Sequence, residues 1–571
     1  MSISQKKLLK YILQFILGLG LLLILAGGLH FLFSPNKSFV QSTVSTSSTS
    51  VNFSSTCGSP SSGPTDNPIV TRYGKNAYPW TDNIKWNCVY NINDFPGSNM
   101  VNRFNAARDA AFANGGGVVY FPSGTYNFTD NIFLKNGVSI RGDNPSVRDA
   151  KSDSYQPPSQ LVFPKYEPTL SGNGTPNNTA FKKILTTSPD SDSNFAVVNL
   201  DINRAGIKLL GDIDNGKKQN ILVFGTRTNN VADPSSQVPD TSFQDAWFRY
   251  SDRFTANIAI NAYANVLVAN NRLNDAITDN YEQPGYKVKP IAGQGEEVIT
   301  YPEGSKVPFH YGNHYGIIVN RSKPGGFALA GEPKTEPGLF RKGIVIRDNW
   351  VFHTMRVAIH AASDGLLIKD NQILDEPNKQ WWTDPAGIRQ PRGAVTYENR
   401  AIDWSGWNVQ IEGNNYQVYR HRVMDTKYLS VDGEGILIQE CCGGSQINGV
   451  SIIKNEGNAY IGLYKVPGIR NVQIRENRLL DNNTPNFPFI YVNANTNNYS
   501  SSMENVIIEN NSLMGGIRGI ATLGGSGNII RNNIGNNTGA IEYSCNVVLQ
   551  GNIGFSVEPC SRVGSSNQPV K

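Results

Sequence analysis

A short repeat constrains the fold of this chain more than any other feature of its sequence. Each copy has two or three aliphatic residues, a variable residue, a polar residue or glycine, and then asparagine, as in residues 266–271 (VLVANN), 344–349 (IVIRDN) and 366–371 (LLIKDN). The copies end at Asn271, Asn349, Asn371, Asn414, Asn477, Asn511, Asn533 and Asn552, with a weaker copy at Asn455. The spacing is 22 residues from Asn349 to Asn371 and from Asn511 to Asn533, and 19 residues from Asn533 to Asn552.

This spacing predicts a parallel β-solenoid rather than a helical repeat, because the apolar period is near two. Each coil would contribute about three short strands, and successive coils would stack about 4.8 Å apart. The recurrent asparagines are then expected to form a ladder inside one turn. Asparagine suits such a turn because it also tolerates the left-handed backbone conformation.

The segment before the repeats begins with an amphipathic stretch and continues with glycines. Phe104, Ala107, Ala111 and Phe112 fall on one helical face, which is suited to covering an exposed sheet edge. Residues 115–126 (GGGVVYFPSGTY) and 137–142 (GVSIRG) follow. This segment resembles the start of the pectate-lyase-like superfamily of right-handed parallel β-helices, where a helix caps the N-terminal end of the solenoid. The resemblance implies the fold and leaves the activity open, because the superfamily holds lyases, hydrolases, epimerases and non-catalytic proteins.

We therefore expect an all-β chain: a right-handed, single-stranded parallel β-helix with an N-terminal capping helix, preceded by one transmembrane helix. Residues 11–33 form an apolar run whose length of about 34 Å is enough to cross a bilayer. Lys6, Lys7 and Lys10 before it predict a cytoplasmic N-terminus and an extracytoplasmic remainder. The run has no clear small-residue cleavage site, which favours a signal anchor over a cleaved signal peptide that would leave the protein secreted. The expected divisions are residues 1–33 (basic tip and anchor), 34–62 (Ser/Thr-rich linker) and 63–571 (β-helix domain).

The six cysteines all follow the apolar run, so an exported chain could use them in disulfides. Their positions favour a Cys57–Cys88 pair at the start of the globular part and a Cys545–Cys560 pair at its end. Cys441 and Cys442 are adjacent and are either a vicinal disulfide or two thiols.

The charge balance excludes one class of partner. Lys plus Arg exceeds Asp plus Glu only enough for a net charge of +5, and no Lys/Arg tract is present. This predicts no nucleic-acid partner.

Candidate site residues come from the distribution of histidine and from an alignment of three strands. Five of the six histidines fall within 112 residues, namely His310, His314, His353, His360 and His421. Aligning Ile317, Val357 and Ile436 as inward-facing residues predicts an outward column. That column would contain Asn320, His360 and Gln439. Four more polar candidates come just before these strands: His314, His353, Asp432 and Glu434. Residues 381–400 are interpreted as an insertion between the second and third coils.

Charged and aromatic residues near this column supply the chemistry that we expect. Asp432 and Glu434 are a carboxylate pair suited to acid–base cleavage of a glycosidic bond, to Ca²⁺ binding, or to a solvated turn. Arg420 and Arg422 flank His421 and could neutralise a uronate carboxylate while a base removes a proton. The next coil adds aromatic and basic candidates for sugar binding, Tyr464 and Lys465.

The leading hypothesis is an enzyme that cleaves the glycosidic bonds of a polysaccharide. As a lyase it would use His360 or His421 as the base; as a hydrolase it would use Asp432 and Glu434. The motif sets of polygalacturonase-like hydrolases and alginate epimerases are absent, so no catalytic residue is carried over from them. A non-catalytic cell-surface protein that binds or organises glycans is the alternative, and a purely structural stalk is a weaker one.

Overall fold

The structure is a computed structural model of the chain, and its residues 57–571 form one compact unit. It describes residues 57, 62–164, 169–170, 176–177, 182–186, 193–209, 219–229, 231, 255–262, 264–274, 314–319, 342–352, 357–375, 381–383, 389–391, 399–419, 421–422, 430–431, 433–439, 447–464, 468–480, 487–493, 502–525 and 527–560. The expected anchor (residues 11–33), most of the linker, Cys441 and Cys442 lie outside these ranges. None of the helices within them has the length and hydropathy needed to cross a bilayer.

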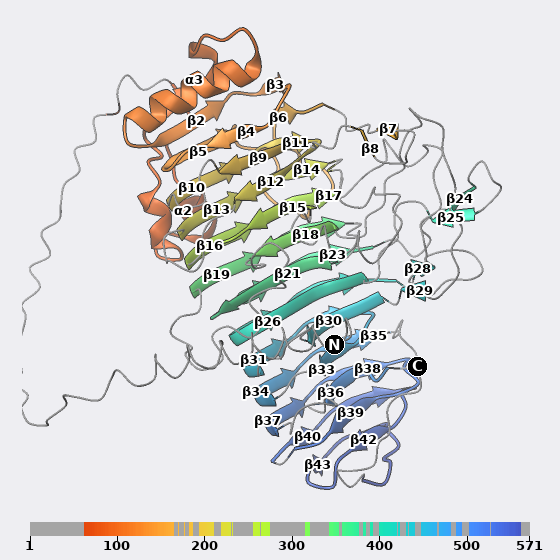
Figure 1. The fold of residues 1–571 in the computed structure, drawn as a ribbon. Helices are drawn as coiled ribbons and strands as arrows, with labels where there is room; N and C mark the ends of the chain where they lie inside the picture. The colour runs from red at the N-terminus through yellow and green to blue at the C-terminus, as the bar shows by residue number, and fades with distance from the viewer. Residues whose placement is uncertain are drawn as a thin grey trace, which may run out of the picture. The chain divides into compact units, whose positions relative to one another are not determined.

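Three parallel sheets stack their strands coil upon coil, as Figure 1 shows. Sheet 1 contains β1 (Val89–Asn91), β2 (Gly117–Phe121), β5 (Val138–Gly142), β10 (Ser193–Val198), β13 (Gln219–Phe224), β16 (Ala264–Ala269), β19 (Lys342–Arg347), β22 (Leu367–Lys369), the end of β26 (Asn399–Glu412), β31 (Ile447–Ile453), β34 (Gly468–Arg475), β37 (Ser502–Glu509), β40 (Ile529–Arg531) and β43 (Val548–Gln550). Sheet 2 contains β4 (Ile132–Leu134), β9 (Lys182–Thr186), β12 (Ala205–Leu209), β15 (Thr255–Ile260), β18 (His314–Val319), β21 (Val357–Asp364), the start of β26, β30 (Gly433–Gln439), β33 (Ile461–Tyr464), β36 (Ile490–Asn493), β39 (Ile520–Leu523) and β42 (Ile541–Tyr543).

Sheet 3 completes each coil between sheets 1 and 2. It contains β3 (Gly124–Asn127), β6 (Ser159–Val162), β11 (Asp201–Asn203), β14 (Arg227–Asn229), β17 (Arg272–Asn274), β20 (Trp350–Phe352), β23 (Gln372–Leu374), β27 (Asn415–Gln417), β32 (Glu456–Gly457), β35 (Arg478–Leu480), β38 (Ser512–Met514) and β41 (Ile534–Asn536). Three antiparallel pairs lie outside the coils: β7 (Thr169–Leu170) with β8 (Pro176–Asn177), β24 (Trp381–Thr383) with β25 (Arg389–Pro391), and β28 (His421–Arg422) with β29 (Ser430–Val431). The stacked sheets confirm the parallel β-helix that the repeat predicts.

The turn between sheets 1 and 3 carries the predicted asparagine ladder. From Asn271 to Asn552, each side-chain Nδ2 donates to the Oδ1 of the asparagine in the next coil at 2.9–3.0 Å. The backbone N–H of each asparagine donates to the same Oδ1, and Nδ2 also donates to a carbonyl of the preceding coil. The ladder asparagines are buried apart from Asn552, so these bonds satisfy polar groups that would otherwise be costly inside the protein.

One detail of this turn differs from the expectation. The left-handed backbone falls on the residue before the ladder asparagine, as at Asp348 (φ 57°) and Asp370 (φ 53°). The asparagine itself is therefore selected for its amide and not for its backbone conformation.

The core lies inside the coils and is built from one inward position per strand. In sheet 2 the inward column consists of isoleucines in register and without exposed area: Ile317, Ile359, Ile402, Ile436, Ile461, Ile490, Ile520 and Ile541. Stacked β-branched side chains fill such a column efficiently because successive strands are separated by the same distance.

The helix α3 (Met100–Ala113) caps the N-terminal end of this core, as predicted. Phe104, Ala107 and Ala111 are fully buried. The prediction that Phe112 shares this face is wrong, because Phe112 is 45% exposed. The fourth buried position is instead Arg108, whose guanidinium donates to the carbonyl of Phe133 at 3.0 Å.

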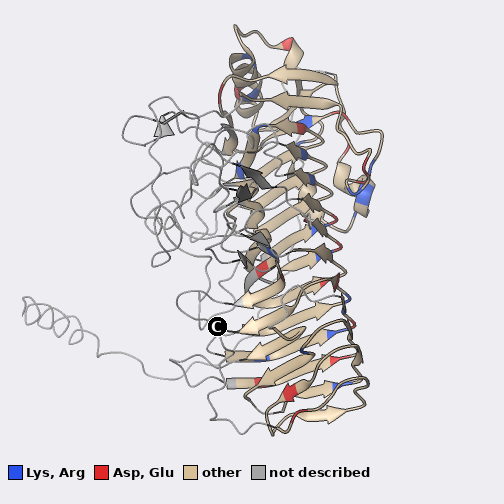
Figure 2. Ribbon diagram, turned by 90° about the vertical axis from the view of Figure 1, so that its right-hand side faces the viewer, with Lys and Arg blue, Asp and Glu red and all other residues tan. Residues whose placement is uncertain are grey.

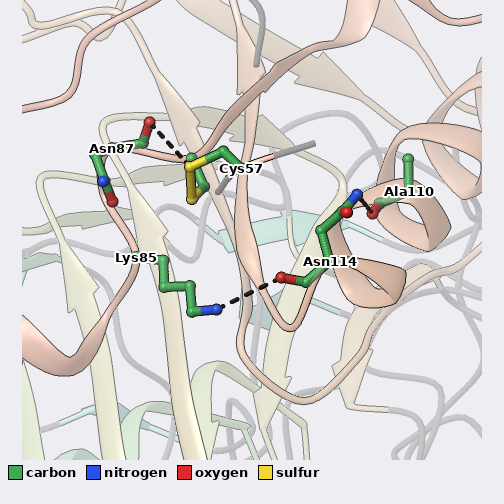
Figure 3. Close-up of a disulfide and its surroundings, with 6 residues drawn as sticks. Cys57, Lys85, Asn87, Ala110 and Asn114 are labelled. Atoms are coloured by element: carbon green, nitrogen blue, oxygen red, sulfur yellow. Dashed lines mark hydrogen bonds between the residues drawn. A yellow bond between two sulfur atoms is a disulfide. The ribbon is translucent and has the colours of Figure 1, made fainter. Parts of the chain in front are cut away.

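Both expected disulfides are present. Cys57 bonds Cys88, and Cys545 bonds Cys560. Figure 3 shows the first of these beside Lys85, whose Nζ donates to the Asn114 carbonyl at the end of α3 at 3.5 Å. The disulfide thus ties Cys57 to the segment just before β1, and the Lys85 hydrogen bond ties this segment to the end of the capping helix.

The outer face of sheet 1 is covered by the chain that precedes the cap. This segment contains α2 (Pro68–Tyr73) and the 3-10 helix η1 (Pro79–Asn83). A second 3-10 helix, η2 (Ile92–Asp94), follows β1, and its Ile92 belongs to the inner core. Ile69 and Trp86 are buried against outward residues of sheet 1 such as Leu222. Sheet 1 therefore presents an apolar, covered outer face over its first coils.

Candidate functional site

The candidate site lies on the outer face of sheet 2, where β18, β21, β26, β30 and β33 are neighbours. Its position depends on an irregularity of these strands. In β21 both Ala358 and Ile359 belong to the core, while Val357 and His360 lie outside it. Two consecutive inward residues, as at a β-bulge, break the usual alternation of faces.

The same arrangement recurs in the neighbouring coils. In β26 Ala401 and Ile402 face the core, which leaves Arg400 and Asp403 on the outer side. In β30 the small inward residue is Gly435, where a Cβ would lie 2.6 Å from the Tyr460 carbonyl oxygen. The irregularity thus places two columns of side chains on the outer face, one through Arg400 and one through Asp403.

Arg400 is the centre of a buried polar network on this face. Its Nη1 donates to Oδ2 of Asp403 at 2.9 Å, and its Nε donates to Oε2 of Glu434. The other oxygen of Glu434 accepts a hydrogen bond from the Tyr460 hydroxyl at 2.9 Å. The Tyr460 and Tyr464 hydroxyls are 3.2 Å apart. One hydrogen-bonded chain therefore links strands β26, β30 and β33.

The electrostatics of the network keep Asp403 ionised. Burial opposes ionisation, but the Arg400 guanidinium and the His360 imidazole outweigh it and lower the pKa of Asp403 to about 2. Burial, and then the charge of Glu434, raises the pKa of Tyr460 well above its usual value. The tyrosine therefore serves as a hydrogen-bond donor and the aspartate as an acceptor.

His360 lies at the edge of this network. Its Nδ1 is 3.8 Å from Oδ2 of Asp403, which is longer than a hydrogen bond. Neither ring nitrogen has a hydrogen-bond partner among the described residues, and both are shielded from solvent. The Tyr315 ring contacts the imidazole edge-on, with centroids 5.7 Å apart. His360 is thus an imidazole next to an anion, in contact with Tyr315 but without a hydrogen bond to any described residue.

An aromatic cluster continues along the outer face from this network. The Tyr460 ring stacks on Phe487 at 5.0 Å, and Tyr464 contacts Tyr491 at 5.5 Å. Tyr460 is fully buried, and Tyr464 and Tyr491 are nearly so. The predicted role of Tyr464 as a stacking platform for sugars is not supported in this arrangement, because its ring packs against protein.

The other predicted site residues fall in several places. The backbones of His314, Gln439, His421 and Arg422 lie in strands β18, β30 and β28, and their side chains are outside the described part of the structure. Outside it altogether are Asn320, His353, Arg420, Asp432 and Lys465. Among the predicted residues with described side chains, His360 and Glu434 belong to the same outer-face network.

The predicted column of Asn320, His360 and Gln439 is wrong. The strand registers pair His360 with Ile318 on one side and with Asp403 on the other. The alignment failed because Val357 faces outward and because residues 399–412 form a complete strand, β26, between the second and third aligned strands. Ile317 and Ile436 do face inward, as expected.

Sequence reasoning missed Arg400 and Asp403, although a signal for them exists. The sequences VAIH (357–360) and RAID (400–403) share the same Ala-Ile pair at the positions that face inward. Matching that pair would have placed Asp403 beside His360.

The described residues contain no group of three or more His, Cys, Asp or Glu side chains that could hold a metal ion. A Ca²⁺ site at Asp432 and Glu434 stays a prediction, since Asp432 is not described.

Several charged residues elsewhere on the described part of the solenoid pair with a residue of opposite charge in the neighbouring coil. Figure 2 shows acidic and basic positions interspersed along the stacked turns. Lys369 Nζ is 3.3 Å from a Glu412 oxygen, and an Arg531 nitrogen is 2.6 Å from a Glu509 oxygen. These are cross-strand pairs between neighbouring coils, which neutralise the outer face of sheet 1.

No family model matches the chain, and no curated protein matches it. Among solved structures it is similar to PfbA, a surface adhesin of Streptococcus pneumoniae (14% identity over 83% of this chain and 93% of that chain, TM-score 0.46). It is also similar to the catalytic unit of a thermostable GH87 alpha-1,3-glucanase from Streptomyces thermodiastaticus strain HF3-3 (12% identity, 84% and 71% covered, TM-score 0.42). A third is the family 28 exopolygalacturonase of Yersinia enterocolitica (10% identity, 82% and 79% covered, TM-score 0.40). At such low identity and TM-score, the fold assignment rests on the strand registers of this chain.

Proposed function

We propose that the chain is an extracytoplasmic, membrane-anchored enzyme that cleaves glycosidic bonds in a polysaccharide on the outer face of sheet 2. The observation that carries the proposal is the buried network around Arg400, which ends at Asp403 beside the His360 imidazole. A solenoid needs no such groups on an outer face, and burying them is costly. Clusters of this kind are typical of functional sites.

The roles follow from the hydrogen bonds. His360 has free ring nitrogens and is the group that can take or give a proton. Both oxygens of Glu434 already accept hydrogen bonds, so its role in this state is to fix Arg400 and Tyr460. In a lyase His360 would remove the proton next to a uronate carboxylate; in a hydrolase it would act on water or on the leaving oxygen.

The test uses the full-length protein in detergent and a panel of neutral and uronic polysaccharides. Ultraviolet absorbance of unsaturated uronate and release of reducing ends are followed together. A rise in both signals means a lyase, and reducing ends alone mean a hydrolase. His360→Gln should lower kcat/KM by about 10²- to 10⁴-fold.

Glu542→Gln is the matched control for this experiment. Glu542 occupies the outward column of Asp403 several coils away and also pairs with an arginine, Arg518. Its substitution should leave the activity unchanged. Equal loss in both variants would mean that general damage to the sheet, and not His360, explains the result.

A second candidate function is a non-catalytic surface protein that binds glycans. It is supported by the saturation of Glu434 and by the shielding of both His360 nitrogens from solvent. Retained binding to a polysaccharide with no product from any polymer would select this function over the enzyme.

A further inference from the structure

The contact between His360 and Asp403 is the part of the site that the proposed reaction leaves unexplained. The two residues are paired across adjacent strands, β21 and β26, so the backbone fixes them opposite each other. The distance of 3.8 Å between Nδ1 and Oδ2 needs to shorten by less than 1 Å to become a hydrogen bond. Catalytic hydrogen bonds are often longer before substrate binds.

The surroundings leave the imidazole few alternatives. On the β18 side, the Tyr315 ring contacts the imidazole, and Ile318 is paired with His360 in the strand register. From β26, Asp403 is the nearest charge, and Arg400 lies behind it. Glu434 of β30 is beyond Arg400. Among the residues that the structure describes, the charged group that faces His360 directly is therefore the Asp403 carboxylate.

Asp403 is itself held in place by Arg400. The same oxygen, Oδ2, accepts the hydrogen bond from Arg400 and faces His360. A carboxylate fixed in this way can accept the Nδ1–H of an imidazole and so select one tautomer, which leaves Nε2 with its lone pair.

We propose that Asp403 is a positioning residue that orients His360, with Nδ1–H toward its carboxylate and Nε2 toward the glycan. The inference rests on the proposed function for its chemistry, but the coupling of the two side chains does not depend on activity. A negative charge next to the imidazole favours its protonated form. Removing that charge in Asp403→Asn should therefore move the titration of the His360 imidazole to lower pH.

The experiment measures this pKa in the full-length protein. Histidine labelled with carbon-13 at Cε1 gives few signals, because the chain has six histidines, and loss of one signal in His360→Gln assigns it. The signal is titrated in the wild type, Asp403→Asn, Asp403→Glu and the control Glu542→Gln. Circular dichroism confirms that each variant is folded. In parallel, kcat/KM is measured against pH on any polymer that is cleaved.

A lower His360 pKa in Asp403→Asn, a pKa near that of the wild type in Asp403→Glu, and no change in Glu542→Gln would support the inference. The limb of the pH profile that reports His360 should move to lower pH by the same amount. An unchanged His360 pKa in Asp403→Asn would overturn it. If Asp403→Asn does not fold, Asp403→Glu decides: its longer side chain should retain the pKa and most of the activity.

The two proposals fail separately. Coupling of His360 to Asp403 without cleavage of any polymer would support the positioning role and reject the enzyme. Cleavage that depends on His360, with no coupling, would support the enzyme and reject the positioning role.

Discussion

The asparagine ladder and the Arg400 network are both columns made by stacking coils, but they are built in opposite ways. In the ladder every member is the same residue, and its amide both donates to the next coil and accepts from the previous one. Each added coil therefore satisfies the one before it. In the network each coil contributes a different residue, and the chain of hydrogen bonds stops at Asp403. The neighbouring His360 has no hydrogen-bond partner among the described side chains.

The difference separates a structural column from a candidate active site. A self-complementary row can extend along the whole solenoid without leaving a reactive group. A row of unlike residues is local, costs free energy to bury, and ends in groups that can bind or react. Substitutions in the two columns should therefore separate stability from function.

The largest effect is expected from breaking the ladder in its middle. In Asn371→Ala four side-chain hydrogen bonds are lost, two donated and two accepted. Buried donors and acceptors are left unpaired in both neighbouring coils, so the free energy of unfolding should fall by roughly 4–6 kcal/mol. Urea unfolding followed by circular dichroism measures this.

Asn415→Ala is the matched control for the ladder. Asn415 follows the ladder residue Asn414 directly but is exposed, so its loss should change stability by less than about 0.5 kcal/mol. Equal effects at Asn371 and Asn415 would contradict the role assigned to the ladder.

The second effect is expected from removing the centre of the network. Arg400→Met would leave the buried carboxylate of Asp403 and the partly buried carboxylate of Glu434 without their shared cation. Breaking a buried pair on one side costs about 3–5 kcal/mol. Arg518→Met removes a more exposed arginine from its pair with Glu542 and should cost about 1 kcal/mol or less. A loss of activity in Arg400→Met well below its melting temperature would show that the network also serves function.

Repetition explains why the fold could be predicted and much of the site could not. Asn371 and Asn414 stand at equivalent turns and have the same chemistry, so the ladder, and with it the solenoid, is visible in the sequence. Phe104 and Ala107 follow a helical period, and the paired cysteines flank the ends of the solenoid. These features repeat or follow a local rule.

The site obeys no repeat. His360 and Glu434 were found as unusual polar residues near strands, and the structure places both on one face; their catalytic roles stay predictions. Asp403 was missed because the strand that follows the predicted insertion of residues 381–400 was not recognised, and because two consecutive inward residues shift the alternation of faces. The register between coils that are about 40 residues apart depends on the lengths of the intervening loops, which no local pattern specifies.

The smallest effect concerns the pH dependence of stability. Because the folded-state pKa of Asp403 is lowered from 3.8 to about 2, its ionised form stabilises the fold. This contribution is fully present above the unfolded value near pH 4 and is lost as the pH falls through about 2. A shift of this size corresponds to about 2 kcal/mol.

Urea unfolding of the wild type and of Asp403→Asn between pH 6 and pH 2 should show a stability difference that shrinks by this amount below about pH 4. Asn371→Ala should show a difference that is independent of pH, because an amide does not titrate. A difference for Asp403→Asn that stays constant down to pH 2 would mean that the Arg400 network does not hold this carboxylate, and the contrast between the two columns would then lose its electrostatic basis.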